Sequence, residues 1–189
     1  MSPTENVKIT VVRSKRKTLA IQLKPGEIIA RAPLRMKEKD IFAFIEAKRE
    51  WISKHMAAIN RQQRLADELQ PFTQEELNAL ALRAKTVIPE RVRFYAAKIG
   101  VSYNNITIRC QRTRWGSCSS NGNLNFNCLL MLLPDEIIDS VVVHELCHRK
   151  HMDHSRQFYA EIYKVFPEYD RCRKWLNENG GVHLKRIAK

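Results

Sequence analysis

Residues 142–154 read VVHELCHRKHMDH, and this stretch decides how the rest of the chain is interpreted. It contains an H-E-x-x-H motif, from His144 to His148, that follows apolar residues with helical spacing after Pro134. On a helix, positions four apart differ by about 40° in azimuth and roughly 6 Å along the axis, so both imidazoles reach one ion. Zinc favours neutral imidazole, and Glu145 is placed to take a proton from zinc-bound water. The stretch therefore predicts a zinc-dependent hydrolytic site on a helix.

The third zinc ligand is expected from the residues after this helix. An unbroken helix would carry His154 roughly 9 Å past His148, so His154 binds only if the helix stops and the chain turns back. No glycine or proline lies between these two histidines, and we expect His151 or Asp153 to end the helix in the left-handed conformation. The spacing favours His154, with His151 on a continuous helix and Glu168 further along the chain as alternative ligands.

The first third of the chain has the pattern of strands followed by a helix. Apolar residues fall on alternate positions from 7 to 32, which is typical of half-buried strands. The basic run 13–17 and the turn Pro25-Gly26 separate three such strands, and the short connections predict a small antiparallel sheet. Helical spacing from Lys39 to about Arg64 predicts one helix after the sheet.

The second part of the chain follows a polar link over residues 62–72. Thr73 and Glu76 form a capping-box signature for a helix that runs to about residue 99, with Pro89 inside it and Gly100 at its end. The other predicted elements are strands over 101–109 and 123–133, and helices from Pro134, over 155–165 and over 171–179, before Gly180-Gly181. The fold class predicted is α+β, with a strand-rich N-terminal region at 1–65 and a metallohydrolase domain at 66–189.

Composition narrows the class of protein further. The formal net charge is +13, which favours polyanionic partners or substrates such as nucleic acid, nucleotides or acidic surfaces. No apolar run is long enough to span a membrane, and Met1–Asn6 has no apolar signal-peptide core, so we expect a cytoplasmic protein without a membrane partner. The five scattered cysteines are expected to be reduced thiols.

Further motifs accompany the histidines along the chain. They are RWGSCS at 114–119, NLNFN at 123–127, Phe158-Tyr159 after His154-Ser155, and, near the N-terminus, Arg16-Lys17, Ala32-Pro33 and Lys48-Arg49 before Trp51-Ile52. Together with VVHELCH at 142–148, they resemble the YgjP-like metallopeptidases. These are grouped with the zincin proteases and are similar around the zinc site to the SprT-like proteases, which repair protein crosslinks to DNA. The resemblance implies a zincin-like C-terminal domain, zinc on His144, His148 and His154, and water activated by Glu145.

The loop at residues 111–122 is a candidate substrate-binding segment. Gly116 permits close backbone approach, and the loop precedes the predicted zinc helix, so Arg114 or Trp115 could contact an extended substrate. The alternative is a tight structural turn with Trp115 buried. Tyr159 is a further candidate, which would face the reacting group opposite Glu145 or serve only in packing. Cys118 is expected to be a small buried thiol.

These observations lead to three hypotheses on function. The first is a zinc metallopeptidase that acts on peptides or proteins, with Glu145 as general base. The second is a metal-dependent hydrolase of nucleoside triphosphates, since the same site can attack phosphorus beside Lys and Arg groups. The third is a nucleic-acid-associated protease of the SprT-like kind, held on DNA or RNA by the basic runs 13–17 and 171–174.

Overall fold

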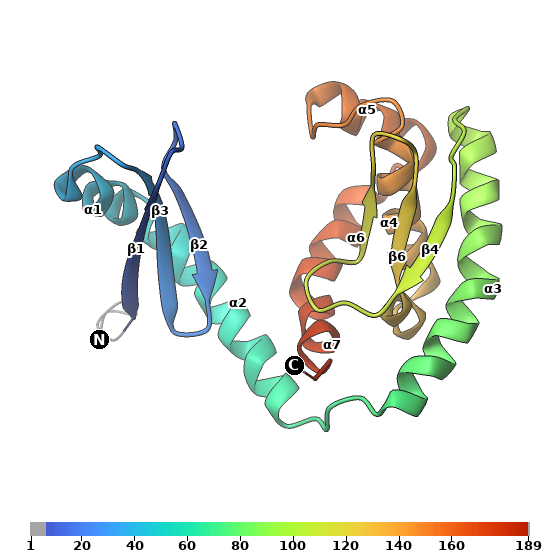
Figure 1. Ribbon diagram of the computed structural model, residues 1–189, viewed down its shortest axis with the longest axis horizontal. Coiled ribbons are helices and arrows are strands. Elements are labelled where there is room, and N and C mark those ends of the chain that lie inside the picture. The colour runs from blue at the N-terminus through green and yellow to red at the C-terminus, as the bar shows by residue number, and fades with distance from the viewer. Residues whose placement is uncertain (1–6, 189) are drawn as a thin grey trace. The chain divides into compact units, whose positions relative to one another are not determined.

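The computed structural model describes residues 7–188, and the chain in it divides into two compact units, one ending at Glu68 and the other beginning at Leu69. Each unit contains a three-stranded sheet with helices, so the fold is mixed α+β (Figure 1). Met1–Asn6, for which the sequence predicts no signal peptide, lies outside the described residues. Within the described range, no helix is both long and apolar enough to cross a membrane.

The N-terminal sheet is mixed rather than antiparallel. It consists of β1 (Lys8–Ser14), β2 (Ala20–Lys24) and β3 (Glu27–Pro33), in the order β1-β3-β2. β3 pairs antiparallel with β2 but parallel with β1, so the predicted antiparallel sheet is wrong for one of its two pairings. The most apolar strand, β3, lies in the centre of the sheet, where β1 pairs with one of its edges and β2 with the other. Residues 15–26, which include β2, supply the long crossover that a parallel pair needs.

Two helices follow this sheet where the sequence predicts one. α1 spans Glu38–Ala47 and α2 spans Arg49–Asp67, with a break at Lys48. The break allows Ile41 of α1 and Ile52 of α2 to enter one core with the inner face of the sheet. Because α2 continues to Asp67, the link between the two units is shorter than the predicted 62–72.

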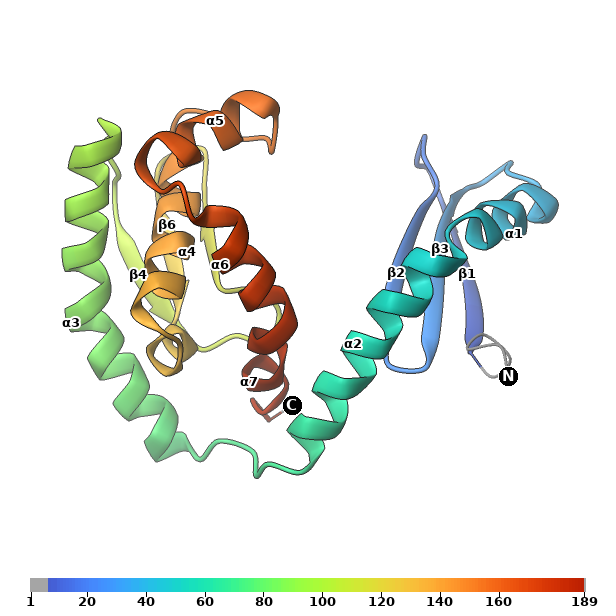
Figure 2. The same ribbon diagram turned by 180° about the vertical axis from the view of Figure 1, so that it is seen from behind.

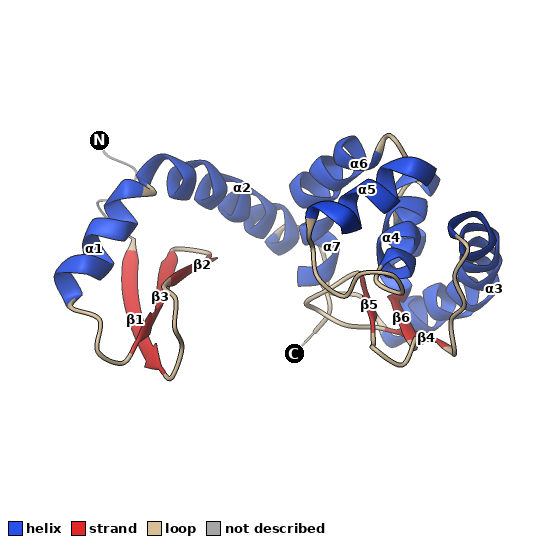
Figure 3. Cartoon of the chain, turned by 90° about the horizontal axis from the view of Figure 1, so that it is seen from above, coloured by secondary structure: helices blue, strands red, loops and turns tan. Residues whose placement is uncertain are grey.

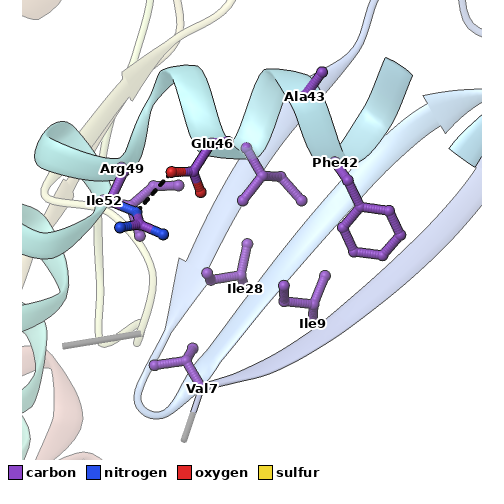
Figure 4. Close-up of a pocket in the computed structure, with 9 residues that line it drawn as sticks. Val7, Ile9, Ile28, Phe42, Ala43, Glu46, Arg49 and Ile52 are labelled. Atoms are coloured by element: carbon purple, nitrogen blue, oxygen red, sulfur yellow. Dashed lines mark ion pairs between the residues drawn. The ribbon is translucent and has the colours of Figure 1, made fainter. Parts of the chain in front are cut away.

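An apolar pocket of about 470 Å³ lies between α1, the start of α2 and the sheet (Figure 4). Ile9 and Ile28 line it from the sheet, and Phe42 lines it from α1. An ion pair between Arg49 Nε and Glu46 Oε1, 2.9 Å apart, lies beside it. The N-terminal unit therefore keeps part of its apolar surface uncovered within the described residues.

The C-terminal sheet has the order β4-β6-β5. β4 (Ile106–Arg109) is parallel to β6 (Leu124–Asn127), and β5 (Gly116–Cys118), which lies inside the predicted loop, is antiparallel to β6. Both predicted strands are too long, because β4 begins only at Ile106 and β6 already ends at Asn127. Its side-chain oxygen accepts from the Leu129 amide and caps the 3₁₀ helix η1 (Cys128–Leu132), while its Nδ2 donates to the carbonyls of the preceding loop.

Cys110 and Cys128 form a disulfide, so the prediction of five reduced thiols is wrong for this pair. The parallel register places Arg109 opposite Asn127, so the next residue on each strand is a cysteine, with the two Cα atoms 5.5 Å apart. The pairing depends on strand register, which the scattered cysteine positions do not reveal. Cys118, Cys147 and Cys172 are free thiols.

The C-terminal unit places α4 (Asp135–Cys147) between α3 (Gln74–Ile99) and α6 (Tyr169–Trp175) (Figure 2). Its other helices are α5 (Arg156–Val165), the π-helical turn η2 (Leu176–Gly180) and α7 (Gly181–Lys185). α3 begins with the predicted capping box, runs through Pro89 and ends at Gly100 in the left-handed conformation. α4 packs against α3, α5, α6 and β5 (Figure 3), so most of its residues are buried.

Gly180-Gly181 does not end the C-terminal helix as predicted. The helical path continues from η2 into α7, and Gly180 is buried. A Cβ at this position would lie 2.9 Å from both Leu176 Cδ1 and Trp115 Cζ2. The glycine is thus required for close packing against Trp115 rather than for helix termination.

Candidate metal centre

The last turn of α4 carries the first half of the candidate site. His144 and Glu145 lie in this turn, and His148 is the C-terminal cap of the helix. The helix stops through short turns, in which the amides of Lys150 and His151 both donate to the Cys147 carbonyl. No non-glycine residue in the described part of the chain has a positive φ, so the expectation of a left-handed His151 or Asp153 is wrong.

The chain then turns back and brings a third histidine to the other two. Ligand atoms of His144, His148 and His154 all lie within 4.8 Å of one another, and the Nε2 atoms of His144 and His154 are 3.1 Å apart. Two nitrogens on a tetrahedral zinc, each about 2.0–2.1 Å from it, are separated by roughly 3.4 Å. The spacing in this cluster is therefore close to that required for binding one ion.

The two alternative third ligands lie elsewhere. Glu168 is exposed, and its Oε2 is 3.2 Å from Arg171 Nε. The side chain of His151 is outside the histidine cluster, although its carbonyl oxygen is 3.0 Å from Nδ1 of His148. The structure thus brings together His144, His148 and His154, and not His151 or Glu168.

Neighbouring groups fix the orientation of the imidazole rings. The Tyr169 hydroxyl lies 2.7 Å from Nδ1 of His144, and Nδ1 of His148 faces the His151 carbonyl, so both rings keep Nε2 available. The buried ring of Phe158 packs within 5.0 Å, centroid to centroid, of all three imidazoles. Sequence reasoning assigned no role to Tyr169, because no local pattern marks it and it lies 25 positions from His144.

Burial disfavours the charged form of two of the histidines. Burial and, to a smaller extent, the charges of the nearby His148, His154 and Arg173 lower the pKa of His144 to about 3. The pKa of His148 is also lowered, mainly by burial. Only neutral imidazole can coordinate a metal ion, so the rings of His144 and His148 need not lose a proton before they bind one at neutral pH.

Glu145 is a buried carboxyl group whose pKa is set mainly by its burial. Its side chain is 6% exposed, and burial raises its pKa to about 8, against the opposing charge of Arg114. Its carboxyl lies against the backbone of Gly116, where a Cβ would be 2.6 Å from Oε1 of Glu145 and 2.7 Å from its Cγ. Glycine is therefore the only residue type that fits at position 116 without a shift of the glutamate side chain.

Two pockets meet at His144, Glu145 and Gly116. The first, which we call the arginine pocket, has a volume of about 300 Å³ and is lined by residues that include Arg114, Trp115, Val141, Tyr169, Arg173 and Leu176. The second, which we call the histidine pocket, has a volume of about 270 Å³ and includes Ser117, Cys118, His148, Met152 and His154. The cluster of histidines and Glu145 thus lies where two cavities join.

The three candidate substrate-binding residues have different environments. Arg114 and Trp115 both line the arginine pocket, although Trp115 is half-buried and also packs against Gly180. Tyr159 does not line this pocket; its ring lies beneath the guanidinium of Arg173, 5.6 Å from Cζ to the ring centroid. Cys118, expected to be buried, is half-buried in the histidine pocket.

Comparison with protein families identifies the class of this chain as a metallopeptidase domain. The model of the family described as "YgjP-like, metallopeptidase domain" matches residues 17–79 and 75–179. The chain belongs to the YgjP-like family. A search of curated proteins found no match.

Two solved structures are similar to part of the chain, and both are crystal structures of metallopeptidase zymogens. Jannalysin of Methanocaldococcus jannaschii is 22% identical with a TM-score of 0.43, over 47% of this chain and 92% of its own. Abylysin of Pyrococcus abyssi is 24% identical with a TM-score of 0.43, over 49% of this chain and 98% of its own.

The contact between Gly116 and Glu145 can be tested with a double-mutant cycle. We expect Gly116→Ala to lower the free energy of unfolding by about 1–3 kcal/mol, because the new methyl group overpacks the glutamate side chain. In a Glu145→Ala background the same change should cost much less, since the atoms it meets are gone. Urea denaturation of the four proteins measures the coupling. Equal costs in both backgrounds would show that Gly116 and Glu145 do not constrain each other.

The raised pKa of Glu145 predicts a pH dependence for the metal-free protein. Between the ordinary pKa of about 4.5 and the folded-state pKa of about 8, the folded state binds more protons than the unfolded state. The contribution of Glu145 to stability is therefore full below pH 4.5 and is lost as pH rises to about 8. Glu145→Gln removes this loss, so in EDTA its stability relative to wild type should increase across that window. A constant difference between the two denaturation series would contradict a proton held on Glu145.

Proposed function

We propose that this protein is a zinc-dependent peptidase with His144, His148 and His154 as metal ligands and Glu145 as general base. The observation that carries the proposal is the junction of the two pockets, where the three clustered imidazoles of His144, His148 and His154 lie beside a buried carboxyl group. Membership of a family of metallopeptidase domains supports it. Three nitrogen ligands favour zinc over magnesium or calcium, which prefer oxygen.

The side chains around the site define the roles in hydrolysis. A bound zinc would polarise the scissile carbonyl and lower the pKa of water. Glu145 takes the proton of the attacking water and returns it to the leaving amine. The positive charge of the occupied site would stabilise the carboxylate form of Glu145, which burial alone disfavours. Tyr169 holds the His144 ring by its hydroxyl group.

The free edge of β5 is the proposed binding place for the substrate backbone. β5 pairs with β6 on one side only, and its residues Gly116, Ser117 and Cys118 line the histidine pocket. An extended peptide can add to such an edge through main-chain hydrogen bonds. This arrangement would place a peptide bond next to Glu145, with neighbouring side chains in the two pockets.

Measurements of zinc binding distinguish the role of His154 from that of the nearby His151. We expect one equivalent of zinc in the purified protein, and a gain in stability of about 2.7 kcal/mol when free zinc is 100 times the Kd. His154→Ala should lose the metal and this gain, whereas His151→Ala keeps both. Elemental analysis and thermal unfolding in zinc buffers make the measurement. Loss of zinc from His151→Ala alone would refute the proposed ligand set.

The role of Glu145 is tested by a change that keeps its size. Glu145→Gln should retain zinc and lower kcat by a factor of about 100 or more, since general-base catalysis contributes roughly 10²–10⁴. Cleavage of a quenched fluorescent peptide library, with zinc content measured on the same samples, gives the result. A zinc-loaded Glu145→Gln protein with the wild-type rate would rule out this mechanism.

The two other hypotheses on function lead to separate measurements. Release of phosphate or pyrophosphate from a panel of nucleoside triphosphates would identify a nucleotide hydrolase, and steeply salt-dependent DNA binding would identify a nucleic-acid-associated protease. The basic run 171–174 gives the latter little support, because Arg171 is paired with Glu136 and Glu168, and Cys172 is buried. In the other run, Arg13 donates to three carbonyl oxygens of residues 33–36.

A further inference from the structure

The arginine pocket combines two cations with an apolar wall. Arg114 comes from the loop before β5 and Arg173 from α6, and both line the pocket that also contains Glu145. Val141 and Leu176 add apolar surface to the same pocket. Among the described residues that line this pocket, Glu145 is the one acidic side chain, and it is buried behind Gly116. The pocket is thus positively charged beside the proposed reaction centre.

Among the described residues, neither arginine forms an ion pair with a carboxylate. The charge of Arg114 acts on the buried Glu145, whose pKa it lowers against the effect of burial. The two arginines of α6 differ in their surroundings. Arg171 pairs with Glu136 and Glu168, whereas Arg173, half a helical turn away, lines the arginine pocket. Two guanidinium groups at one pocket, neither in an ion pair among the described residues, favour an anionic ligand.

A ring contact holds the Arg173 side chain at the pocket, and hydrogen bonds hold the Arg114 backbone there. The guanidinium of Arg173 lies over the ring of Tyr159, a cation–π contact that limits its movement. The backbone of Arg114 is fixed because its carbonyl accepts from Asn127 Nδ2 at 2.9 Å, and the next carbonyl, of Trp115, accepts from the Asn127 amide at 2.8 Å. Asn127 itself is fully buried. Tyr159 therefore acts as a positioning residue for Arg173.

We infer that the arginine pocket binds a carboxylate of the substrate, on the residue next to the scissile bond, through Arg114 and Arg173. The carboxylate is an acidic side chain or the free C-terminus of a peptide, both of which match the planar fork of a guanidinium. This inference rests on the proposed peptidase function and specifies its substrate class. A pocket of about 300 Å³ lies at the small end of ligand-binding cavities, which suits one side chain with its adjoining backbone.

The test compares amidated peptides that differ only by Glu or Gln at each position around the cleavage site. We expect kcat/KM to be at least about tenfold higher for Glu at one position adjacent to the scissile bond, because a charge-assisted hydrogen bond contributes about that factor. A Gln peptide that ends there with a free carboxyl group distinguishes a C-terminal carboxylate from a side chain. A ratio near one for both carboxylates would overturn the inference.

Three variants test whether the preference for Glu over Gln arises in the arginine pocket. Arg114→Gln and Arg173→Gln should each reduce the Glu-to-Gln ratio towards one, and Tyr159→Leu should reduce it partly. Lys174→Gln is the matched control, since it removes a charge from the same helix at a residue that does not line the pocket, and the ratio should stay at the wild-type value. Zinc content and thermal unfolding confirm that each variant is folded. A ratio that survives both arginine substitutions would overturn the assignment.

A binding measurement makes the inference independent of hydrolysis. Fluorescence anisotropy gives the Kd of labelled Glu and Gln peptides for zinc-loaded Glu145→Gln. Tighter binding of the Glu peptide, lost in Arg173→Gln, supports the carboxylate subsite even if the wild-type protein cleaves no peptide, in which case the proposed hydrolysis alone fails. Equal Kd values overturn the subsite whether or not peptides are cleaved. Binding of ATP or UTP that depends on both arginines, without a carboxylate preference, would overturn it in favour of phosphate.

Discussion

One constraint dominates the structure of the C-terminal unit: the buried helix α4 has ionisable side chains in its last turn. α4 is surrounded by α3, α5, α6 and β5, yet its last turn holds His144 and Glu145. Burying an unpaired charge is costly, so these groups are neutral in the metal-free protein, with the pKa of His144 lowered and that of Glu145 raised. Opposite pKa shifts in adjacent residues reflect one cause, which is the removal of water from both.

Several distant segments adapt to this helix. Gly116 on β5 leaves space for the Glu145 side chain, the Tyr169 hydroxyl reaches His144, and Phe158 packs beneath the imidazoles. The turn after α4 is held by Arg149, which donates to the carbonyl oxygens of Ser102 and Ser120. The site is therefore built by contacts between elements far apart in sequence, whereas the H-E-x-x-H motif that predicts it lies at the end of α4.

This division explains what the sequence could predict. The pair His144 and His148 follows from helical periodicity, and the capping box at Thr73 follows from local hydrogen bonding, so both are visible in short stretches of sequence. The parallel pairing of β1 with β3 and the Cys110–Cys128 disulfide depend on strand order and register, which local patterns do not carry. The return of the chain to His154 lies between these cases, since the spacing allows it but only the turn geometry decides between His154, His151 and Glu168.

The structure shows which of the basic residues behind the net charge of +13 have partners within the protein. Arg91 is held by Asp135 and Asp139, Arg171 by Glu136 and Glu168, and Arg13 and Arg149 by backbone carbonyls, so these cations stabilise the fold. A count of basic residues cannot separate such structural cations from those left for a ligand. Charge in a cavity acts more strongly than the same charge on an open surface, because low-dielectric walls screen it less. Arg114 and Arg173, which line the arginine pocket beside the histidine cluster, are therefore the cations that we propose to act on the choice of substrate.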